Sequence, residues 1–578
     1  MGRTTKTATS AAMILTGLLN PGLVNAQQAT PVVSGTTREE VTPPPLIEAA
    51  PKPRLQIDGD IERAPCPLAD PAYANLKLTI NGATFNNLQG VDPKELRSAY
   101  EEFLGQSRPV STICTIRDAA ATILRRKGYL AAVQVPTQQI ENGNVRFEVL
   151  YARIVAVRVR GAAGRSESLI AGYLQKLTQD PVFNRNTAER YLLLARDLPG
   201  YDVRLELKSA GGKPGDLVGE VTVLRTPFEV DFNVQNYASR ETGRLGGQLR
   251  AQIYGLTGFG DRTTFALYST ADFKEQQIIQ VGHDFRVGPE GLTFGGRFSY
   301  AWTTPGLQAN SQPIKARTLF ASLEAGYPFL RSQYANIRGA GGLDFVDQTV
   351  RFSGTEITRD RLRVGYVRID ADTIDTRGGL TPRYRLAGSL EFRKGLTILG
   401  ASDTLPAGIA PPSRRDGKAT GAVVRFQGVA ESTPIPNITF SIAPRAQYGF
   451  NPLLSFEEFS AGTYTIGRGY DPGTILGDSG VGFSAEIRIN RVGPMKNSNL
   501  AVQPFIFVDS AWVWNKGATG DPQRLTSIGG GVRASLAGRA RLDLTLAIPT
   551  AAAGLQTQRG DTRLLLSFTT KLWPWGNR

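Results

Sequence analysis

The chain has 578 residues, 63 of them glycine, with a net charge of +15, a pI near 9.8 and a mean hydropathy of −0.19. So basic a chain would suit nucleic acid, but no basic run is interleaved with aromatic residues, so we expect no nucleic-acid partner. Two cysteines and one histidine cannot assemble a structural zinc site, and no phosphate-binding loop appears, so we expect neither metal nor cofactor.

Residues 1–26 have the pattern of a secretory signal peptide. Arg3 and Lys6 precede a modest apolar stretch, and Val24-Asn25-Ala26 is a small-residue cleavage pattern. Asn20-Pro21-Gly22 interrupts the apolar stretch well short of the ~20 residues that a spanning helix needs. No later segment supplies such a run, which leaves periplasmic, secreted and outer-membrane locations.

Residues 27–70 are rich in Pro, Thr, Glu and Ala, and we predict a linker because they bury too little apolar surface to fold independently. Cys66 lies near its end, and Cys114 is the only other cysteine. We expect the two to form a disulfide in an oxidising compartment; two free buried thiols are the alternative.

Residues 71–152 predict a small module with the order strand, helix, helix, strand, strand. Asp92 and Pro93 begin the first helix, and Gly128 ends the second, which starts near Ile116. The predicted strands cover 76–80, 129–135 and 145–149.

Residues 153–226 repeat this order in a second module. Its two predicted helices span 166–176 and 187–196, and we expect Asn186 and Glu189 to form the capping pair of the later one. The predicted strands cover 154–159, 203–207 and 217–224.

After Pro227 the helical period disappears and short alternating strands begin. In 481–490, for example, apolar residues occupy every odd position and Gly, Ser, Glu, Arg and Asn the even ones. About sixteen such runs lie between Pro227 and Trp573, an even number that suits a bacterial membrane barrel with a cationic lumen. A soluble β-sandwich is the alternative, although its outward face should be less apolar.

The segment 465–471 lies in a long glycine-rich loop, which we place at about 451–480. Gly467 and Gly469 permit a tight backbone path, and the Arg468 fork needs a carboxylate partner if it is withdrawn from water. A surface turn is the alternative interpretation of Gly-Arg-Gly alone.

These features together resemble the TpsB transporters of two-partner secretion, ShlB/FhaC/HecB-like haemolysin secretion/activation proteins related to the barrel-assembly insertases. The resemblance covers nearly all of the chain from Cys66 onward. Residues 128–143 look like the second half of a first POTRA domain, and 189–200 look like part of a second. The resemblance implies a membrane β-barrel of about 16 antiparallel strands at 227–578, preceded by two periplasmic α+β POTRA domains at 71–152 and 153–226.

The stretch Ile466-Gly467-Arg468-Gly469-Tyr470 resembles the loop-6 motif of that family, whose arginine is held inside the barrel by an aspartate on strand 13. Phe507-Val508-Asp509-Ser510-Ala511 matches the aspartate-bearing motif, which implies Asp509 and Phe507 as lumenal partners. Alternation places Phe507, Asp509 and Ala511 on the inner face. Ala511 stands where the family usually has glycine.

Two departures from the family pattern concern the ends of the chain. The lumen-plugging N-terminal helix of the family has no convincing counterpart in residues 27–65. The chain also lacks a terminal Phe, so recognition by the assembly machinery is expected to use Phe568 or Trp573.

The resemblance implies a pore in the outer membrane of a Gram-negative bacterium that moves an unfolded, TpsA-like exoprotein with an N-terminal secretion domain to the cell surface. Its other implied partners are outer-membrane lipids and, during biogenesis, the barrel-assembly machinery. An insertase of the same superfamily and a general porin are the alternatives.

Two stretches suggest other functions. Gly477-Asp478-Ser479-Gly480 looks like a protease nucleophile motif, but the only histidine, His283, lies far upstream, so we expect no catalytic residues and no enzyme. Glu39-Glu40-Val41-Thr42 resembles an energy-coupling box, whose receptors carry larger, 22-stranded barrels.

Overall fold

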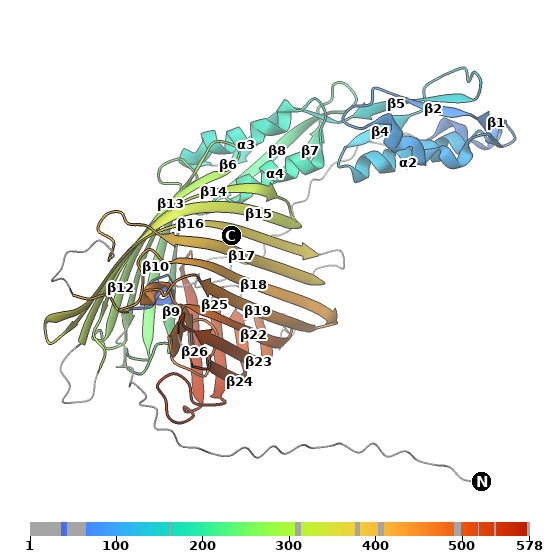
Figure 1. Ribbon diagram of the computed structural model, residues 1–578. Coiled ribbons are helices and arrows are strands. Elements are labelled where there is room, and N and C mark those ends of the chain that lie inside the picture. Colours follow the sequence, from blue (N-terminus) through green and yellow to red (C-terminus); the bar gives the residue numbers. More distant parts are fainter. Residues whose placement is uncertain are drawn as a thin grey trace, which may run out of the picture. The chain divides into compact units, whose positions relative to one another are not determined.

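The C-terminal part of the chain forms a closed barrel of sixteen antiparallel strands, which confirms the predicted fold class (Figure 1). Each strand pairs with its neighbour in sequence, and the last strand closes the barrel on the first, with Phe568 opposite Val234. The strands are β9 (Phe228–Gln235), β10 (Gly246–Tyr254), β11 (Arg262–Thr270), β12 (Gln276–Val287), β13 (Leu292–Thr303), β14 (Ile314–Arg331), β15 (Ala335–Phe352), β16 (Thr355–Asp375), β17 (Tyr384–Gly395), β18 (Ala422–Ile435), β19 (Ile438–Gly449), β22 (Ser479–Ile489), β23 (Leu500–Trp514), β24 (Gln523–Leu536), β25 (Ala540–Pro549) and β26 (Arg563–Trp573).

The computed structural model describes residues 36–42, 65–161, 163–306, 314–375, 382–402, 410–490, 499–517, 520–536 and 539–574. The predicted signal peptide and most of the predicted linker lie outside the described residues. Within the described ranges, no helix is both long and apolar enough to cross a membrane.

The barrel strands separate an apolar outer face from a polar inner face. On β23, Ile506 is 60% exposed on the outside, whereas Asp509 is fully buried on the inside. The same alternation leaves Leu546 of β25 exposed and its neighbour Ala547 buried. An apolar outer face suits lipid, and the inner face is free to carry charge.

The first module packs two short sheets against one α-helix. In the larger sheet β2 runs parallel and β4 antiparallel to the central strand β5, and β1 pairs with β3. Its elements are η1 (Pro67–Ala69), η2 (Pro71–Tyr73), β1 (Lys77–Ile80), β2 (Gly82–Asn86), η3 (Pro93–Ala99), η4 (Glu101–Phe103), β3 (Gln106–Pro109), α2 (Thr112–Arg126), β4 (Ala131–Gln134) and β5 (Asn144–Tyr151).

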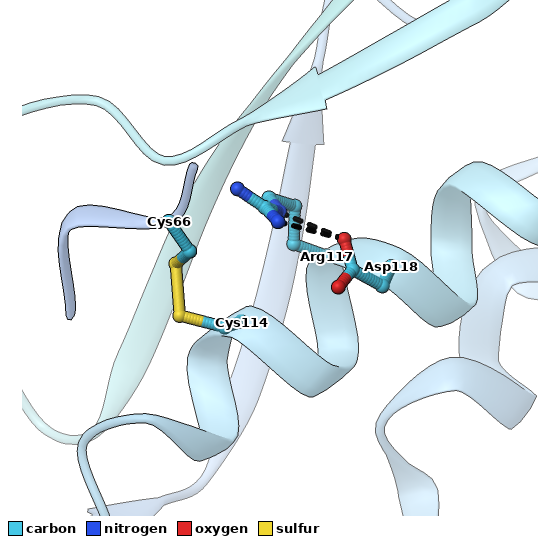
Figure 2. The surroundings of a disulfide bond; sticks show 4 residues. All are labelled: Cys66, Cys114, Arg117 and Asp118. Atoms are coloured by element: carbon cyan, nitrogen blue, oxygen red, sulfur yellow. Dashed lines mark hydrogen bonds and ion pairs between the residues drawn. A yellow bond between two sulfur atoms is a disulfide. The ribbon is translucent and has the colours of Figure 1, made fainter. Parts of the chain in front are cut away.

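The predicted disulfide joins the start of this module to its helix. Cys66 and Cys114 are bonded, with their Cα atoms 6.0 Å apart. Figure 2 shows Cys114 in the first turn of α2 and Cys66 on a separate segment, which lies directly before η1 in the sequence. The bond therefore fixes the chain where it enters the module.

The second module places two helices on a three-stranded sheet in which β8 is central, parallel to β6 and antiparallel to β7. Ile170, Tyr173 and Leu192 on the helices and Val221 on β8 belong to its core. Its elements are β6 (Arg153–Gly161), η5 (Gly164–Ser166), α3 (Glu167–Gln179), α4 (Arg185–Arg196), β7 (Tyr201–Ser209) and β8 (Asp216–Arg225).

Two local predictions in the modules were wrong. The helix expected after Asp92 is a pair of 3-10 turns, because Tyr100 leaves the helical region at φ −136° and separates them. The helix expected to be capped by Asn186 and Glu189 starts earlier, and Asn184 is its N-cap, accepting a hydrogen bond from the N–H of Asn186. The Glu189 carboxylate instead accepts from the N–H of Gln333 in the turn between β14 and β15.

Candidate functional site in the barrel lumen

The long loop between β19 and β22, residues 450–478, folds into the barrel and is called loop 6 below. It contains η7 (Ser455–Glu457) and a hairpin of β20 (Phe459–Ala461) and β21 (Ile475–Gly477). Its Ile466 and Tyr470 are 2% exposed and share an apolar cluster with Ala511 and Leu525 of the wall. Loops normally run over protein surfaces, so burial of this kind marks it as part of the lumen.

Arg468 at the tip of loop 6 meets Asp509 on β23, the thirteenth barrel strand. The guanidinium donates from Nε and Nη2 to the two carboxylate oxygens at 2.9 and 2.7 Å. The backbone N–H of Arg468 donates to the same carboxylate at 3.0 Å. The structure thus brings the two residues together in the two-pronged geometry that only arginine offers.

A second carboxylate, Glu486 on β22, accepts from Nη1 of Arg468 at 2.6 Å. Its other oxygen accepts from Arg488 and Arg533 at 2.6 and 2.9 Å. Burial by itself would lower the pKa of the Arg468 guanidinium, but the hydrogen bond and charge of Asp509 and the charge of Glu486 raise it. Sequence reasoning did not assign Glu486 to the site, although its even-numbered position had placed it on the polar face.

The predicted partner Phe507 lies under Arg468, whose Cζ is 3.6 Å from the ring centroid. A guanidinium stacked this closely gains from the negative face of the ring as well as from the carboxylates. The arginine is therefore held from two sides.

The neighbouring motif residues fit the tip against the wall. Gly467 has φ +115°, and a Cβ there would lie 2.5 Å from Leu525. At Gly469 a Cβ would lie 2.9 Å from the backbone nitrogen of Pro549. The Tyr470 hydroxyl lies 2.9 Å from the carbonyl of Thr526, so the motif has no room for larger residues.

The base of loop 6 is clamped to another part of the wall through Glu457. Its carboxylate accepts two hydrogen bonds from Arg393 on β17, at 2.9 and 2.8 Å, and its backbone carbonyl accepts one from Arg425 on β18 at 2.8 Å. Arg393 is 1% exposed and also bonds Asp344 and Glu391. This cluster was not predicted.

Of residues 27–65, in which the sequence offers no convincing counterpart of the plug helix, the structure describes 36–42 and 65. A single turn, α1 (Arg38–Val41), lies inside the barrel, where Val41 is 1% exposed and belongs to a cluster with Phe320 and Val346. A four-residue turn is too short to show helical periodicity, so the sequence pattern could not reveal it. It overlaps the stretch that resembles an energy-coupling box.

A polar cavity of about 910 Å³ remains in the lumen between this segment and the second module. Six arginines line it, among them Arg262 and Arg297, together with five carboxylates, among them Asp284 and Glu324. The lining is therefore highly charged but close to neutral, and the expected cationic lumen stays a prediction.

The protease-like stretch supports the base of loop 6. Asp478 accepts hydrogen bonds from the N–H groups of Leu453 and Lys516, and Ser479 accepts one from the N–H of Gly449. His283 lies on β12, where its Nδ1 is 2.9 Å from the Thr263 hydroxyl. Within the described ranges, no group of three or more His, Cys, Asp or Glu side chains could hold a metal ion.

Comparison with solved structures shows a similar fold in several proteins. CdiB from Escherichia coli is 14% identical with a TM-score of 0.71, over 89% of this chain and 94% of that one. CdiB from Acinetobacter baumannii is 16% identical with a TM-score of 0.63, over 89% and 91%. BamA from Haemophilus ducreyi lacking POTRA domains 1-3 is 14% identical with a TM-score of 0.50, over 86% and 99%.

Comparison with family models identifies the chain more closely, although no curated protein matches it. The POTRA domain model of ShlB type matches residues 78–151. The model described as haemolysin secretion/activation protein ShlB/FhaC/HecB matches residues 221–534, more than half of the chain. The chain therefore belongs to the ShlB/FhaC/HecB family of haemolysin secretion/activation proteins, the transporters of two-partner secretion.

Proposed function

We propose that this protein captures an unfolded exoprotein through its POTRA modules and passes it through the barrel to the cell surface. Family membership implies a secreted, TpsA-like exoprotein partner and points to the outer membrane of a Gram-negative bacterium. The observation that carries the finer proposal is the closed barrel with a charged lumen, preceded by two modules with open sheet edges. The modules then lie in the periplasm, where the exoprotein arrives.

The open edges offer a way to hold an extended chain. In the second module β6 is an edge strand, and its Val155 and Val159 are 41% and 46% exposed. An extended polypeptide can add to such an edge by backbone hydrogen bonds, which gives affinity without requiring one particular sequence. The exoprotein is thus bound by the edges of the module sheets rather than by a deep pocket.

Transport by this route needs no chemical step by the protein, and we propose that it has no enzymatic activity. Downhill binding in the periplasm and folding of the exoprotein outside provide the direction of movement. The apolar outer face contacts membrane lipids. Assembly into the membrane uses the barrel-assembly machinery, which recognises Phe568 or Trp573 of the closing strand β26.

A gene deletion distinguishes this function from that of an insertase. We expect the mutant to lose one or a few large exoproteins from the culture supernatant, with other barrels at wild-type levels in the outer membrane. A broad fall in other barrels would favour the insertase, and an unchanged supernatant proteome combined with reduced uptake of small solutes would favour a porin. Quantitative mass spectrometry of both fractions reads all three outcomes.

A further inference from the structure

The lumen wall binds residues 36–42 as a peptide. Their backbone is recognised at two points: Gln280 and Ser299 donate to the carbonyl of Val41 at 2.9 and 3.0 Å, and Gln348 donates to the carbonyl of Thr36 at 3.0 Å. Every residue of any polypeptide carries such a carbonyl. This part of the site is therefore indifferent to sequence.

Side chains of the segment add a preference. Glu39 pairs with Arg445 at 3.3 Å and Glu40 accepts a hydrogen bond from Gln276 at 3.3 Å, and two further subsites hold Val41 and Arg38. The first is apolar: Val41 is 1% exposed and belongs to an apolar cluster that includes Ile278, Ala301, Phe320 and Val346. A β-branched or similarly compact apolar side chain suits it, because a larger one would have to displace the packed wall.

The second subsite is anionic and holds Arg38. The guanidinium lies 3.7 Å from Glu391 and 4.0 Å from Glu457, beyond hydrogen-bonding distance of either carboxylate, and its Nη1 is buried with no hydrogen-bond partner. The contact is an ion pair without directed hydrogen bonds. A lysine or arginine of another polypeptide should therefore fit this subsite as well as Arg38 does, because no fixed hydrogen-bond geometry is required.

The charge count explains why a cation belongs there. Three carboxylates, Asp344, Glu391 and Glu457, meet the guanidinium groups of Arg393 and Arg425. Without Arg38, therefore, three negative charges face two positive ones. Arg368 also approaches Glu391, at 3.7 Å, but it is bonded more closely to Glu324 and Asp370. An emptied site would keep an unbalanced negative charge at a place where the wall already binds backbone carbonyls.

We propose that this lumenal site is a polypeptide-binding station that residues 36–42 occupy in the resting protein, and that segments of the exported chain bind there in their place. The preferred segment carries a basic residue three positions before a compact apolar one, as Arg38 and Val41 do. This inference rests on the proposed function, since it requires a polypeptide to enter the lumen.

The test uses purified full-length protein carrying Arg38→Ala and Val41→Asp, which weaken its own segment at both subsites. The probe is a fluorescent, end-capped peptide with the sequence of residues 36–42, and binding is measured by fluorescence anisotropy. We expect saturable binding that weakens with salt, about tenfold weaker for the same peptide with alanine in place of its arginine. The wild-type protein should bind the probe at least tenfold more weakly, because its own segment competes.

Wall variants locate the site. Adding Glu391→Gln should weaken probe binding about tenfold, and Ser299→Ala should weaken it for both peptides alike, since it affects backbone recognition. Glu229→Gln, which removes a carboxylate paired with Lys571 elsewhere on the wall, is the matched control and should change nothing. Heat-modifiable migration in gel electrophoresis confirms that each variant is a folded barrel.

Equal binding of the arginine and alanine peptides, or equal binding by the Glu391→Gln and Glu229→Gln variants, would overturn the inference. The same holds if the folded double variant binds no probe. If the variants fail to fold, the wild-type protein is used instead, and the arginine and alanine peptides are compared for their block of single-channel currents. Equal block by the two peptides overturns the inference. Exoprotein secretion is measured separately. If the peptide does not bind but secretion is normal, the lumenal binding site is refuted and the proposed function is not.

Discussion

Replacement of Arg468 by alanine should release the tip of loop 6 from the barrel wall. Asp509 is fully buried and would keep the Ser484 hydroxyl at 2.8 Å, the Ser527 hydroxyl at 3.5 Å and the backbone N–H of residue 468, but no ion-paired cation among the residues that the structure describes. Leaving a buried charge without its partner costs about 3–5 kcal/mol. The lost stabilisation should appear as local opening of loop 6 rather than as unfolding of the barrel, because the backbone hydrogen bonds between the sixteen strands remain intact.

The reciprocal change is expected to be milder. In Asp509→Ala, Arg468 keeps the Glu486 carboxylate at 2.6 Å, so no charge is left entirely unpaired. Arg468→Lys should recover little, because the two-pronged contact with Asp509 is lost. The double variant Arg468→Ala with Asp509→Ala should be no worse than Arg468→Ala alone, since it also removes the stranded carboxylate.

Hydrogen exchange followed by mass spectrometry measures this opening directly. Peptides covering residues 459–477 should exchange roughly 10²- to 5 × 10³-fold faster in Arg468→Ala, as about 3–5 kcal/mol implies, and secretion should fall with it. Arg533→Ala is the matched control, because Arg533 shares Glu486 but belongs to β24. Unchanged exchange in Arg468→Ala, or an equal increase in Arg533→Ala, would refute the reasoning.

Three further changes test other parts of the structure. Deleting residues 462–478 should raise single-channel conductance in planar bilayers, and deleting residues 36–42 as well should raise it further, because both segments occupy the lumen. If the second deletion has no added effect, residues 36–42 do not obstruct the pore. Glu457→Gln should also raise conductance by loosening the base of loop 6, whereas Glu229→Gln should leave it unchanged; equal currents in both variants would argue against the clamp to Arg393. Replacing Cys66 and Cys114 by serine should lower the stability of the first module by about 4 kcal/mol, the chain-entropy value for a loop of this span. Limited proteolysis should then cut first between residues 65 and 126. An unchanged digestion pattern would show that the disulfide contributes little.

The pattern of alternating residues was enough to predict a barrel of about sixteen strands and the inner position of Asp509, and the structure confirms a barrel of sixteen. Strand alternation is a local pattern, so the inner and outer faces of β22 and β23 can be read from neighbouring residues. The cysteine pairing was equally accessible, because the chain has only two cysteines. The pairing of Arg468 with Asp509 came from the family resemblance, and the structure supplies its geometry.

The contents of the lumen could not be predicted from the sequence, because they depend on contacts between distant parts of the chain. Glu457 and Arg393 are 64 positions apart, and a polar residue that faces a closed lumen has the same sequence pattern as one that faces bulk water. The segment 36–42 has almost no structure of its own beyond one turn, and it is ordered by contacts with strands more than 200 residues away. Such long-range contacts leave no periodic signal in the sequence, because they depend on the closure of the barrel around the segment.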